Sequence, residues 1–447
     1  MSPTMHRGDR EPHLVIIGGG FGGLALVRNL RKAPLAITLV DRRNYHLFQP
    51  LLYQVATGSL SPANIAAPLR NLLRKQSNVR VLLGDVVDIE LGSRRIVFRE
   101  GTLPFDLLVV AAGSTHSYFG HNEWNRTAPG LKSIEDATAI RRKVLLAFEE
   151  AEKATDPALV PELLTFVICG AGPTGVELAG AIAEIANDTL RHEFRHIDPS
   201  SARVVLVEAA DRVLPAYPQD LSERAREMLE RLGVQVRTQT RVKQVEPDHV
   251  VLEYDGREEK LPSRRILWAA GVQASPLAKT LAEACGAQLD RAGRISVQAD
   301  FTIPGCPDIF VIGDMALCLG SDGKQLPGVA PVAMQEGQFV AREIMARLTA
   351  APQPPPFTYH DRGSMATIGR LKAVADLRGW HFAGALAWFI WLFVHLMQLV
   401  QFESRVLVLI QWTWHYFTRN RSARLITGEE PTAHQTDEAK LAAVVRE

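Results

Sequence analysis

Residues 14–41, LVIIGGGFGGLALVRNLRKAPLAITLVD, contain the pattern that decides the fold. The apolar run at 14–17 has the length and the β-branched content of a buried parallel strand. It leads directly into GGGFGG at 18–23, which satisfies the pattern G-x-G-x-x-G. Apolar residues then recur at helical spacing, and a second apolar run at 37–40 ends on Asp41. The stretch therefore predicts a strand, a tight glycine turn, a helix and a return strand of a doubly wound α/β fold.

The glycines of this motif have separate physical roles in binding a dinucleotide. Gly18 makes the tight turn, Gly20 lets a pyrophosphate approach the backbone, and Gly23 lets the helix pack closely on the sheet. A carboxylate at Asp41 can accept hydrogen bonds from ribose hydroxyls. The alternative is a glycine-rich hairpin, which the flanking strands, the helix and the acidic end disfavour. The motif leaves open whether the dinucleotide is NAD or FAD.

Length and composition are those of an ordinary globular protein. A chain of 447 residues is too long for one core, so we expect two or three domains. A formal net charge of +1 gives no basic field for nucleic acid. The polar N-terminus, followed at once by the first strand, is not a secretory signal. Four cysteines without C-x-x-C or zinc-type spacing indicate reduced, mostly buried thiols in a cytosolic compartment, and no ligand cluster suggests a metal.

The opening pattern returns in the middle of the chain. An apolar run at 164–169 leads into GAGPTG at 170–175, a helix over 176–185, and a strand at 204–207 that ends on Glu208. Two complete strand–loop–helix–strand contexts are much more specific than one. The second context therefore predicts a second dinucleotide site, and Glu208 favours a free 2′-hydroxyl, hence NAD over NADP.

Each copy also contains a later strand that ends in small residues. The runs at 105–113 and 265–271 both end in Ala-Ala-Gly, and small residues are needed where backbone lies against a cofactor. The two halves are therefore internal copies. Arg212, four residues after Glu208, leaves NADP open, because a nearby arginine can accept a 2′-phosphate.

The segment 42–58 follows Asp41 and is aromatic and apolar without a clean period. Loops at the carboxyl ends of parallel strands line the ligand crevice, so Pro50 and its neighbours could form a wall for a flat ring. An ordinary packed loop is the alternative, and the pattern supports both. His46, a lone histidine, is interpreted as structural rather than catalytic.

A third feature is an apolar strand at 308–312 that closes with Gly313 and Asp314. Two fingerprints, two Ala-Ala-Gly strand ends and a terminal Ile-Gly-Asp resemble the flavoprotein oxidoreductases with two dinucleotide-binding domains. In that superfamily the first fingerprint holds FAD and the second holds NAD(P)H. The aspartate of the Ile-Gly-Asp strand hydrogen-bonds the ribityl or pyrophosphate part of FAD.

The resemblance implies site residues for both cofactors. For FAD they are Gly18, Gly20, Phe21, Gly22, Gly23, Asp41, Arg42, Pro50, Ala112, Gly113, Gly313 and Asp314. For NADH they are Gly170, Gly172, Pro173, Thr174, Gly175, Glu208, Ala270 and Gly271.

Residues 328–338, GVAPVAMQEGQ, together with residues 48–53 and the C-terminal tail, are similar to the type II NADH dehydrogenases, and this resemblance covers nearly the whole chain. That family carries an A-Q-x-A-x-Q signature near the flavin and the quinone. The matching stretch here is APVAMQ at 330–335, in which Pro331 replaces the first glutamine. The resemblance implies a catalytic role for Gln335 and a quinone pocket formed by Pro331, Ala333, Met334 and Gln335.

Glu177 lies two residues past the last glycine of the second fingerprint. It matches an acidic residue that the family places near the nicotinamide and the flavin, which makes it the other catalytic candidate. The alternative is a glutamate in the first helical turn that complements the helix dipole and needs no function. The sequence leaves both interpretations open.

The cysteines help to separate the predicted function from rival functions of the same superfamily. Disulfide reductases of the superfamily carry a cysteine pair beside the flavin, and none is present here. Sulfide:quinone reductase also needs flavin-side cysteines. Cys169 and Cys318 keep it open, although the NAD fingerprint with Glu208 would have no role there. A reductase of a soluble electron carrier such as ferredoxin, and a non-catalytic flavoprotein that uses its tail as an interaction module, are further alternatives.

The tail contains two apolar stretches. Residues 380–402 carry no formal charge and are long enough to span a bilayer, and a second run at 406–417 precedes Arg419, Arg421 and Arg424. Two aromatic helices followed by arginines predict an anchor that lies on anionic lipid, and the monotopic family supports this. A buried dimer interface is the alternative; both can hold together, and we expect a homodimer.

These observations combine into one expectation. The FAD-binding domain comprises residues 10–125 and 293–370, the NADH-binding domain 126–292, and the membrane-anchoring region 371–447, which ends in a polar stretch at 429–447. We expect an FAD-dependent oxidoreductase that passes a hydride from NADH to FAD and two electrons to a quinone, peripherally bound at the cytoplasmic side of the cell inner membrane. No bundle of charged transmembrane helices is visible, so we expect no proton pumping.

Overall fold

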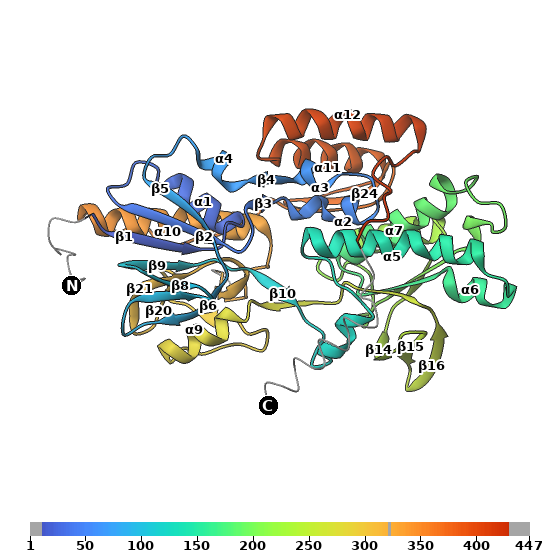
Figure 1. Ribbon diagram of the computed structural model, residues 1–447, viewed down its shortest axis with the longest axis horizontal. Coiled ribbons are helices and arrows are strands. Elements are labelled where there is room, and N and C mark those ends of the chain that lie inside the picture. Colours follow the sequence, from blue (N-terminus) through green and yellow to red (C-terminus); the bar gives the residue numbers. More distant parts are fainter. Residues whose placement is uncertain (1–10, 321–322, 429–447) are drawn as a thin grey trace.

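The computed structural model describes residues 11–320 and 323–428. Two parallel sheets lie side by side along the long axis of the molecule, and the last helices lie across the top (Figure 1). We call each sheet with its helices a unit, the first unit beginning at residue 13 and the second at residue 165. The polar stretch expected at 429–447 lies outside the described residues.

The sheet of the first unit takes strands from two distant parts of the chain. Its order is β20-β21-β9-β1-β2-β5, and every neighbouring pair is parallel except β20 and β21. The predicted strands around the opening glycines are confirmed, since Leu14 pairs with Ile37 on one side and Leu107 on the other. The strand bounds are β1 His13–Ile17, β2 Ala36–Asp41, β5 Val79–Leu83, β9 Leu107–Val110, β20 Thr302–Ile303 and β21 Cys306–Val311.

The sheet of the second unit is entirely parallel, in the order β13-β12-β11-β17. Its strands are β11 Thr165–Cys169, β12 Arg203–Val207, β13 Val234–Arg237 and β17 Arg265–Trp268. Each unit also contains an antiparallel meander of three strands. The meanders are β6 Val86–Glu90, β7 Arg95–Phe98 and β8 Gly101–Pro104 in the first unit, and β14 Thr240–Val245, β15 His249–Tyr254 and β16 Arg257–Pro262 in the second. The recurrence of meander and sheet agrees with the internal copies predicted from the sequence.

Helices cover both sheets. The first helix of each unit, α1 (Phe21–Asn29) or α7 (Pro173–Glu184), follows the glycine turn directly. Helix α10 (Ala330–Thr349) packs along α1, where a Cβ atom at Gly337 would lie 2.4 Å from the carbonyl oxygen of Gly22. Only glycine permits this approach, which fixes the N-terminal half of α10 beside the glycine turn. The other helices of the two units are α2 Leu52–Ala56, α3 Pro62–Ile65, α4 Leu69–Leu73, α5 Ile134–Lys153, α6 Val160–Leu163, α8 Gln219–Arg231 and α9 Leu277–Cys285.

Short antiparallel strands link the units. Strand β10 (Ser114–His116), which leaves the first sheet, pairs with β18 (Val272–Ala274), which leaves the second. The segment 42–58 is also more regular than its sequence suggests, because it forms β3 (Tyr45–Leu47), paired with β4 (Ala66–Pro68), and then helix α2. A further short pair joins β19 (Ile295–Ser296) to β22 (Ala316–Leu317).

A third layer lies above the second unit. Strands β23 (Ser364–Gly369), β24 (Lys372–Leu377) and β25 (Trp380–Ala383) form an antiparallel sheet, and helices α11 (Ala385–Gln398) and α12 (Phe402–Thr418) lie on top of it (Figure 1). The uncharged run 380–402 is therefore divided into a strand, a helix and a connection. Among the described residues, no helix has both the length and the hydropathy to cross a membrane. We call α11 and α12 the tail helices.

Candidate functional site

The glycine turn of the first unit has the geometry that a dinucleotide needs. Gly18 has φ +107°, and a Cβ atom there would lie 2.2 Å from the carbonyl oxygen of Ala111. A Cβ atom at Gly23 would lie 1.9 Å from the carbonyl oxygen of Gly18, whereas one at Gly20 would meet nothing within 4 Å. The turn and the helix contact thus require glycine, and the open side at Gly20 leaves room for a pyrophosphate at the helix N-terminus.

The carboxylate at the end of β2 is part of the same turn. Asp41 accepts hydrogen bonds from the backbone N–H of Gly19 through Oδ2, at 2.6 Å, and of Arg43 through Oδ1, at 2.7 Å. Burial raises the pKa of Asp41 above its ordinary value, and these two hydrogen bonds oppose the shift. His46 is buried, and its Nδ1 lies 3.0 Å from the carbonyl oxygen of Gly19. Its predicted structural role is confirmed, since it supports the turn from behind.

The second unit repeats this arrangement almost atom for atom. Gly170 has φ +100°, a Cβ atom at Gly175 would lie 1.8 Å from the carbonyl oxygen of Gly170, and the space beside Gly172 is open. Glu208 accepts hydrogen bonds from the N–H of Ala171 at 2.6 Å and of Ala210 at 2.8 Å. The residues present in both turns therefore fit an adenine dinucleotide.

Arg212, which left NADP open, lies next to the second turn. Its Nη2 donates to the carbonyl oxygen of Pro215 at 3.3 Å. This contact ties the guanidinium to its own loop.

A cavity of about 170 Å³ is lined by the linking strands β10 and β18, by residues 313–318 and by the start of α10, and we call it the Asp314 cavity. Ser114 donates a hydrogen bond to Asp314, and Lys132 Nζ lies 2.7 Å from Ser114 Oγ and 3.7 Å from Asp314 Oδ2. Glu336 accepts a hydrogen bond from the N–H of Gly313 at 2.5 Å, and burial raises its pKa to about 8. The sequence does not predict roles for Ser114, Lys132 or Glu336, although Glu336 lies within the stretch 328–338 quoted for the family resemblance.

The four residues predicted for the quinone pocket do not lie together around one cavity. Ala333 lines the Asp314 cavity and lies against the first glycine turn, since a Cβ atom at Gly22 would be 3.2 Å from its carbonyl oxygen. Gln335 donates to the carbonyl oxygen of His360 at 3.0 Å and accepts from the N–H of His360 at 2.9 Å. Pro331 and Met334 are the neighbouring residues at the start of α10. In this structure the amide of Gln335 fastens the linker that follows α10.

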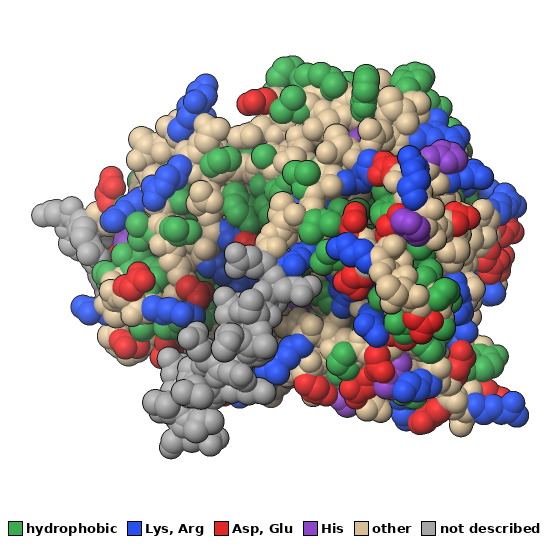
Figure 2. All heavy atoms as spheres, turned by 45° about the vertical axis from the view of Figure 1, so that its right-hand side comes forward, with side chains coloured by type: hydrophobic (Ala, Val, Ile, Leu, Met, Phe, Trp, Pro, Cys, Tyr) green, Lys and Arg blue, Asp and Glu red, His purple; other side chains and the backbone are tan. Residues whose placement is uncertain are grey.

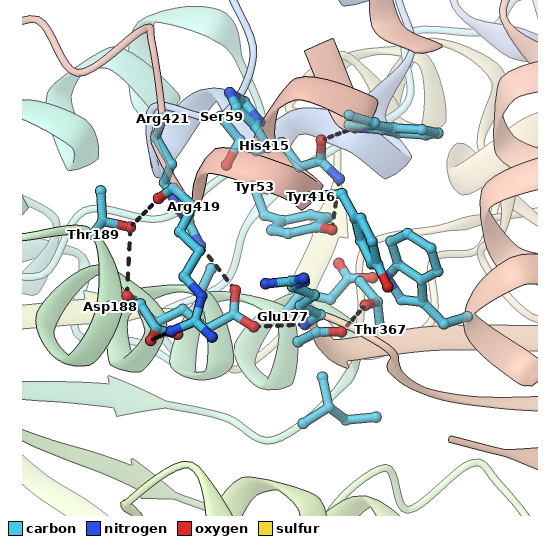
Figure 3. Close-up of a pocket in the computed structure, with 18 of the residues that line it drawn as sticks. Tyr53, Ser59, Glu177, Asp188, Thr189, Thr367, His415, Tyr416, Arg419 and Arg421 are labelled. Carbon is cyan, nitrogen blue, oxygen red and sulfur yellow. Dashed lines mark hydrogen bonds and ion pairs between the residues drawn. The ribbon is translucent and has the colours of Figure 1, made fainter. Parts of the chain in front are cut away.

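A second cavity, of about 140 Å³, lies beneath the tail helices, and we call it the Glu177 cavity. Figure 3 shows Tyr53, Thr367, His415 and Tyr416 around Glu177, contributed by α2, β23, α12 and α7. Burial raises the pKa of Glu177 well above the usual carboxyl range, partly offset by a backbone hydrogen bond from Thr367. Because no acidic residue stands in the first turn of α7, the helix-dipole interpretation of Glu177 loses its basis.

The arginines after α12 pair with carboxylates of the second unit. Arg421 is 9% exposed and pairs with Glu184 at 3.0 Å, at the end of α7. Arg424 makes two contacts with Glu193, at 2.6 and 2.8 Å. Arg419 pairs with Asp188 at 2.9 Å. Carboxylates far away in sequence thus pair with all three arginines, and contact of the tail with anionic lipid stays a prediction.

The outer face of the tail helices is apolar. Figure 2 shows hydrophobic side chains gathered over them at the top of the molecule. The large exposed side chains there are Leu386, Phe389, Phe393, Met397, Phe402, Val406, Leu407, Leu409, Ile410, Trp414 and Phe417. A continuous patch of this kind marks a surface that contacts lipid or another protein.

The cysteines are placed unfavourably for disulfide chemistry. Cys318 lines the Asp314 cavity, whereas Cys169 is buried in β11 of the second unit. Burial raises the pKa of each of these two thiols to about 12. Reactive cysteines have lowered pKa values, so the structure disfavours the sulfide:quinone reductase alternative. Among the described residues, no three His, Cys, Asp or Glu side chains group as a metal site.

Comparisons with known families and proteins agree with this geometry. Residues 12–337 match the family of pyridine nucleotide-disulphide oxidoreductases, and residues 361–420 match the NDH2 C-terminal domain. The chain is 45% identical to the type II NADH:quinone oxidoreductase Ndh of Mycobacterium tuberculosis, over 97% of this chain and 95% of that protein. It is 30% identical to the internal alternative NAD(P)H-ubiquinone oxidoreductase A1 of Arabidopsis thaliana mitochondria, over 92% and 85%.

Solved structures agree on the fold. The structure of NDH2 from Plasmodium falciparum in complex with NADH superposes with a TM-score of 0.85 at 22% identity, covering 94% of this chain and 100% of that one. The sulfide:quinone oxidoreductase of Aquifex aeolicus has the same general fold, with a TM-score of 0.69 at 16% identity over 96% and 95%. The expected fold class, two dinucleotide-binding units followed by a C-terminal helical region, is confirmed.

Proposed function

Since the chain belongs to the type II NADH:quinone oxidoreductase family, we propose that it oxidises NADH and reduces a membrane quinone through bound FAD. FAD, when bound, supplies the redox chemistry, because it accepts a hydride and passes on two electrons. The observation that carries the proposal is the pair of equivalent glycine turns in one chain. The Glu177 cavity lies between α7, the helix that follows the second turn, and the tail helices. A non-catalytic scaffold would not need the open space beside Gly20 and Gly172.

The first unit is assigned to FAD and the second to NADH. Support for FAD comes from the open space at Gly20, from the carboxylate of Asp41, and from the Asp314 cavity, which lies against the same unit. Support for NADH comes from Gly172 and Glu208, which repeat that arrangement. Phe21, Arg42, Pro50, Ala112, Gly113, Pro173, Thr174, Ala270 and Gly271 remain predicted contacts.

Glu336 and Glu177, the two carboxyl groups beside the cavities whose pKa is raised, are the candidates for holding protons. Burial raises the pKa of Glu336 to about 8, so at neutral pH this carboxyl group is mostly protonated. It can therefore line the Asp314 cavity without placing a second negative charge beside that of Asp314. Burial likewise favours the protonated form of Glu177. We propose that Glu177 exchanges a proton with the quinone side of the reaction. Pro331, Ala333, Met334 and Gln335 remain predicted contacts of the flavin and the quinone.

The membrane side of the reaction is assigned to the tail helices. Their exposed aromatic and aliphatic face suits a helix pair lying in the lipid interface, with apolar burial rather than arginine contacts providing the attraction. A reductase of a soluble electron carrier would have no use for such a face. We place the protein peripherally at the cytoplasmic side of the inner membrane, as a homodimer; analytical ultracentrifugation in detergent measures whether two chains associate.

The test is stopped-flow mixing of the flavin-loaded protein with NADH, followed by a panel of quinones in the presence of lipid vesicles. We expect NADH to bleach the flavin absorbance, a quinone to restore it, and NADPH to react more slowly. A flavin band that NADH leaves unchanged would point to the non-catalytic alternative. Acidification of one side of sealed vesicles by the enzyme alone would contradict the absence of pumping.

The membrane assignment has its own test. Phe389→Ser together with Phe393→Ser should weaken sedimentation with vesicles while leaving the reduction of flavin by NADH intact. Replacing Leu425, which is also exposed but lies beyond α12, serves as the control. Undiminished binding of the double variant would favour a soluble carrier as the acceptor.

A further inference from the structure

The carboxylate of Asp314 is held by side chains from two other parts of the chain. Ser114, on β10, donates a hydrogen bond to Oδ2 of Asp314. Nζ of Lys132, the residue before the N-cap of α5, lies 2.7 Å from Oγ of Ser114 and 3.7 Å from Oδ2 of Asp314. The side chains of Lys132 and Asp314 are 23% and 25% exposed, so water and salt screen their attraction only in part.

The chemistry of these groups leaves one direction for the contacts. An ammonium group can only donate, so the hydroxyl oxygen of Ser114 must accept from Lys132. An ionised carboxylate can only accept, so the hydrogen of the Ser114 hydroxyl must point to Asp314. Hydrogen bonds to charged groups are stronger than those between neutral groups, and this hydroxyl contacts a charged group on each side. Lys132 therefore orients the hydroxyl of Ser114, which in turn orients the carboxylate of Asp314.

The backbone of Lys132 is itself held on two sides. Its N–H donates to Oδ2 of Asp136 at 2.9 Å, and its carbonyl oxygen accepts from Nε2 of Gln49 at 3.1 Å. Asp136 also closes a capping box with Ser133 at the start of α5. The ammonium group is thus presented from the capped end of a helix of 20 residues, which keeps its position fixed.

The second oxygen of Asp314 is open to the cavity. Among the described residues, no hydrogen bond reaches Oδ1 of Asp314. Asp314 and Gly328 both line the Asp314 cavity, and a Cβ atom at Gly328 would lie 3.4 Å from Oδ1. Because Gly328 places no side chain in front of Oδ1, this oxygen can accept a hydrogen bond from a molecule in the cavity.

Lys132 also balances the charge of Asp314. Arg294 lines the cavity too, but its guanidinium is engaged by Asp290, with contacts of 2.6 and 2.9 Å. Within the part of the chain that the structure describes, Lys132 is therefore the cation paired with Asp314. FAD carries a negatively charged pyrophosphate, and the first unit already presents the carboxylate of Asp41. An unpaired charge on Asp314 would add to the repulsion of that ligand.

We propose that Lys132 and Ser114 are positioning residues that hold the carboxylate of Asp314 with Oδ1 open to the cavity, where it can accept a hydrogen bond from a hydroxyl group of bound FAD. The inference rests on the proposed flavin-dependent function, and it assigns two residues that determine how long FAD stays bound. Lys132 acts through Ser114 and Asp314 and needs no contact with FAD itself.

The test measures release of FAD from the full-length, flavin-loaded protein. The protein is diluted, and the flavin that has left it is separated by filtration at set times and quantified by its absorbance. Lys132→Met removes the charge at similar length, Lys132→Arg keeps the charge, and Ser114→Ala removes the hydroxyl. Glu135→Gln is the matched control, because it lies in the first turn of the same helix and breaks an exposed pair with Arg43.

We expect Lys132→Met and Ser114→Ala each to release FAD roughly tenfold faster than the parent, as expected for one lost hydrogen bond to a charged group. Lys132→Arg should stay within about threefold of the parent and Glu135→Gln within about twofold. Asp314→Ala should itself speed release, and adding Lys132→Met to it should speed release no further, because Lys132 acts through Asp314. Should Lys132→Met fail to fold, Ser114→Ala takes its place in the cycle with Asp314→Ala.

Unchanged release of FAD in Lys132→Met and Ser114→Ala would overturn the inference. So would an acceleration by Lys132→Met that is equally large without the carboxylate of Asp314, or release from Lys132→Arg as fast as from Lys132→Met. Failure of the proposed function is a different outcome, in which the unsubstituted protein retains no FAD or retains FAD that NADH does not bleach.

Discussion

The two units of this chain present the same glycine turn to a dinucleotide, yet they carry a different side chain at one position beside the turn. In both units the first glycine has a φ near +100°, and a Cβ atom added to the last glycine would lie less than 2 Å from a carbonyl oxygen. An acidic residue at the end of the next strand accepts two backbone hydrogen bonds in each unit. Two residues past the last glycine, however, the first unit has Ala25 and the second has Glu177. The fold evidently does not require a carboxylate there.

The elements that cover the two helices explain the difference. Helix α1 is covered by α10, which approaches at Gly337. Helix α7 is covered by β23, where a Cβ atom at Gly180 would lie 1.7 Å from the carbonyl oxygen of Ile368. The tail helices then roof the space beside Glu177. The repeated frame thus carries an additional carboxyl group only on the side where the chain adds its third layer, and we infer that this group serves the chemistry.

The largest effect is expected from the glycines that the frame itself requires. Gly23→Ala should abolish flavin retention, because its Cβ would overlap the carbonyl oxygen of Gly18 and cost about 4 kcal/mol or more locally. Gly175→Ala makes the same clash in the second unit and should leave flavin bound while NADH binding is lost. Absorbance at the flavin band and NADH titration measure the two effects. Loss of flavin in Gly175→Ala alone would exchange the assignment of the units.

The next largest effect is a loss of stability when the ion pairs between the tail arginines and the second unit are broken. Arg421→Gln should destabilise the protein by about 3–5 kcal/mol, since it leaves the carboxylate of Glu184 buried without its partner. Arg419→Gln is the control, because its pair with Asp188 is exposed and should contribute less than about 1 kcal/mol. Urea unfolding followed by tryptophan fluorescence compares the two. Equal losses would mean that the buried pair has no special role.

A smaller effect separates the acidic strand ends. Glu208→Ala should raise the Michaelis constant for NADH by roughly tenfold to a hundredfold, as expected for one or two lost charge-assisted hydrogen bonds, with flavin content unchanged. Asp41→Ala should instead lower the flavin content and leave the Michaelis constant for NADH unchanged. Steady-state kinetics and flavin content of the two variants decide between these assignments. Release of flavin by Glu208→Ala would again reverse the units.

The smallest effect is a pH dependence beside the Asp314 cavity. The pKa of Glu336 is about 8 in the folded protein against an ordinary value of 4.5, so the folded state binds more protons than the unfolded state between these pH values. The stability contribution of this group is therefore full below pH 4.5 and is lost as pH rises towards 8. Glu336→Gln should raise the melting temperature at pH 9 relative to the parent and change it less at pH 5. A variant less stable at both pH values would show that the charged form is the favoured one.

The frame of the molecule was readable from sequence, and the contacts between its distant parts were not. Local patterns predicted β1, α1 and β2, and the second fingerprint, because glycine spacing and apolar periods act within one unit. The pairing of Arg421 with Glu184 spans 237 residues, and no local pattern reports it. The same holds for Gln54 and Trp412, 358 residues apart. The sequence predicts no regular element at 42–58, because helix α2 is buried on all sides and shows no amphipathic period.

The tail shows the same limit in another form. Its composition correctly indicated an apolar surface helix pair, but Trp380 begins strand β25 rather than a helix, since Gly384 with φ +76° separates the two elements. The arginines beyond α12 suggested lipid, and only the fold reveals that Asp188, Glu184 and Glu193 lie within reach of them.

The most direct test of the central claim, that Glu177 serves the reaction and not the fold, is stopped-flow reoxidation of Glu177→Gln by quinone, measured together with its thermal stability. Because burial raises the pKa of Glu177, stability from its protonated form is lost as pH rises, and glutamine should make the protein as stable as the parent or more stable at pH 8. We predict this together with a fall in the quinone-dependent rate of roughly tenfold or more. A destabilised variant with an unchanged rate would contradict the account.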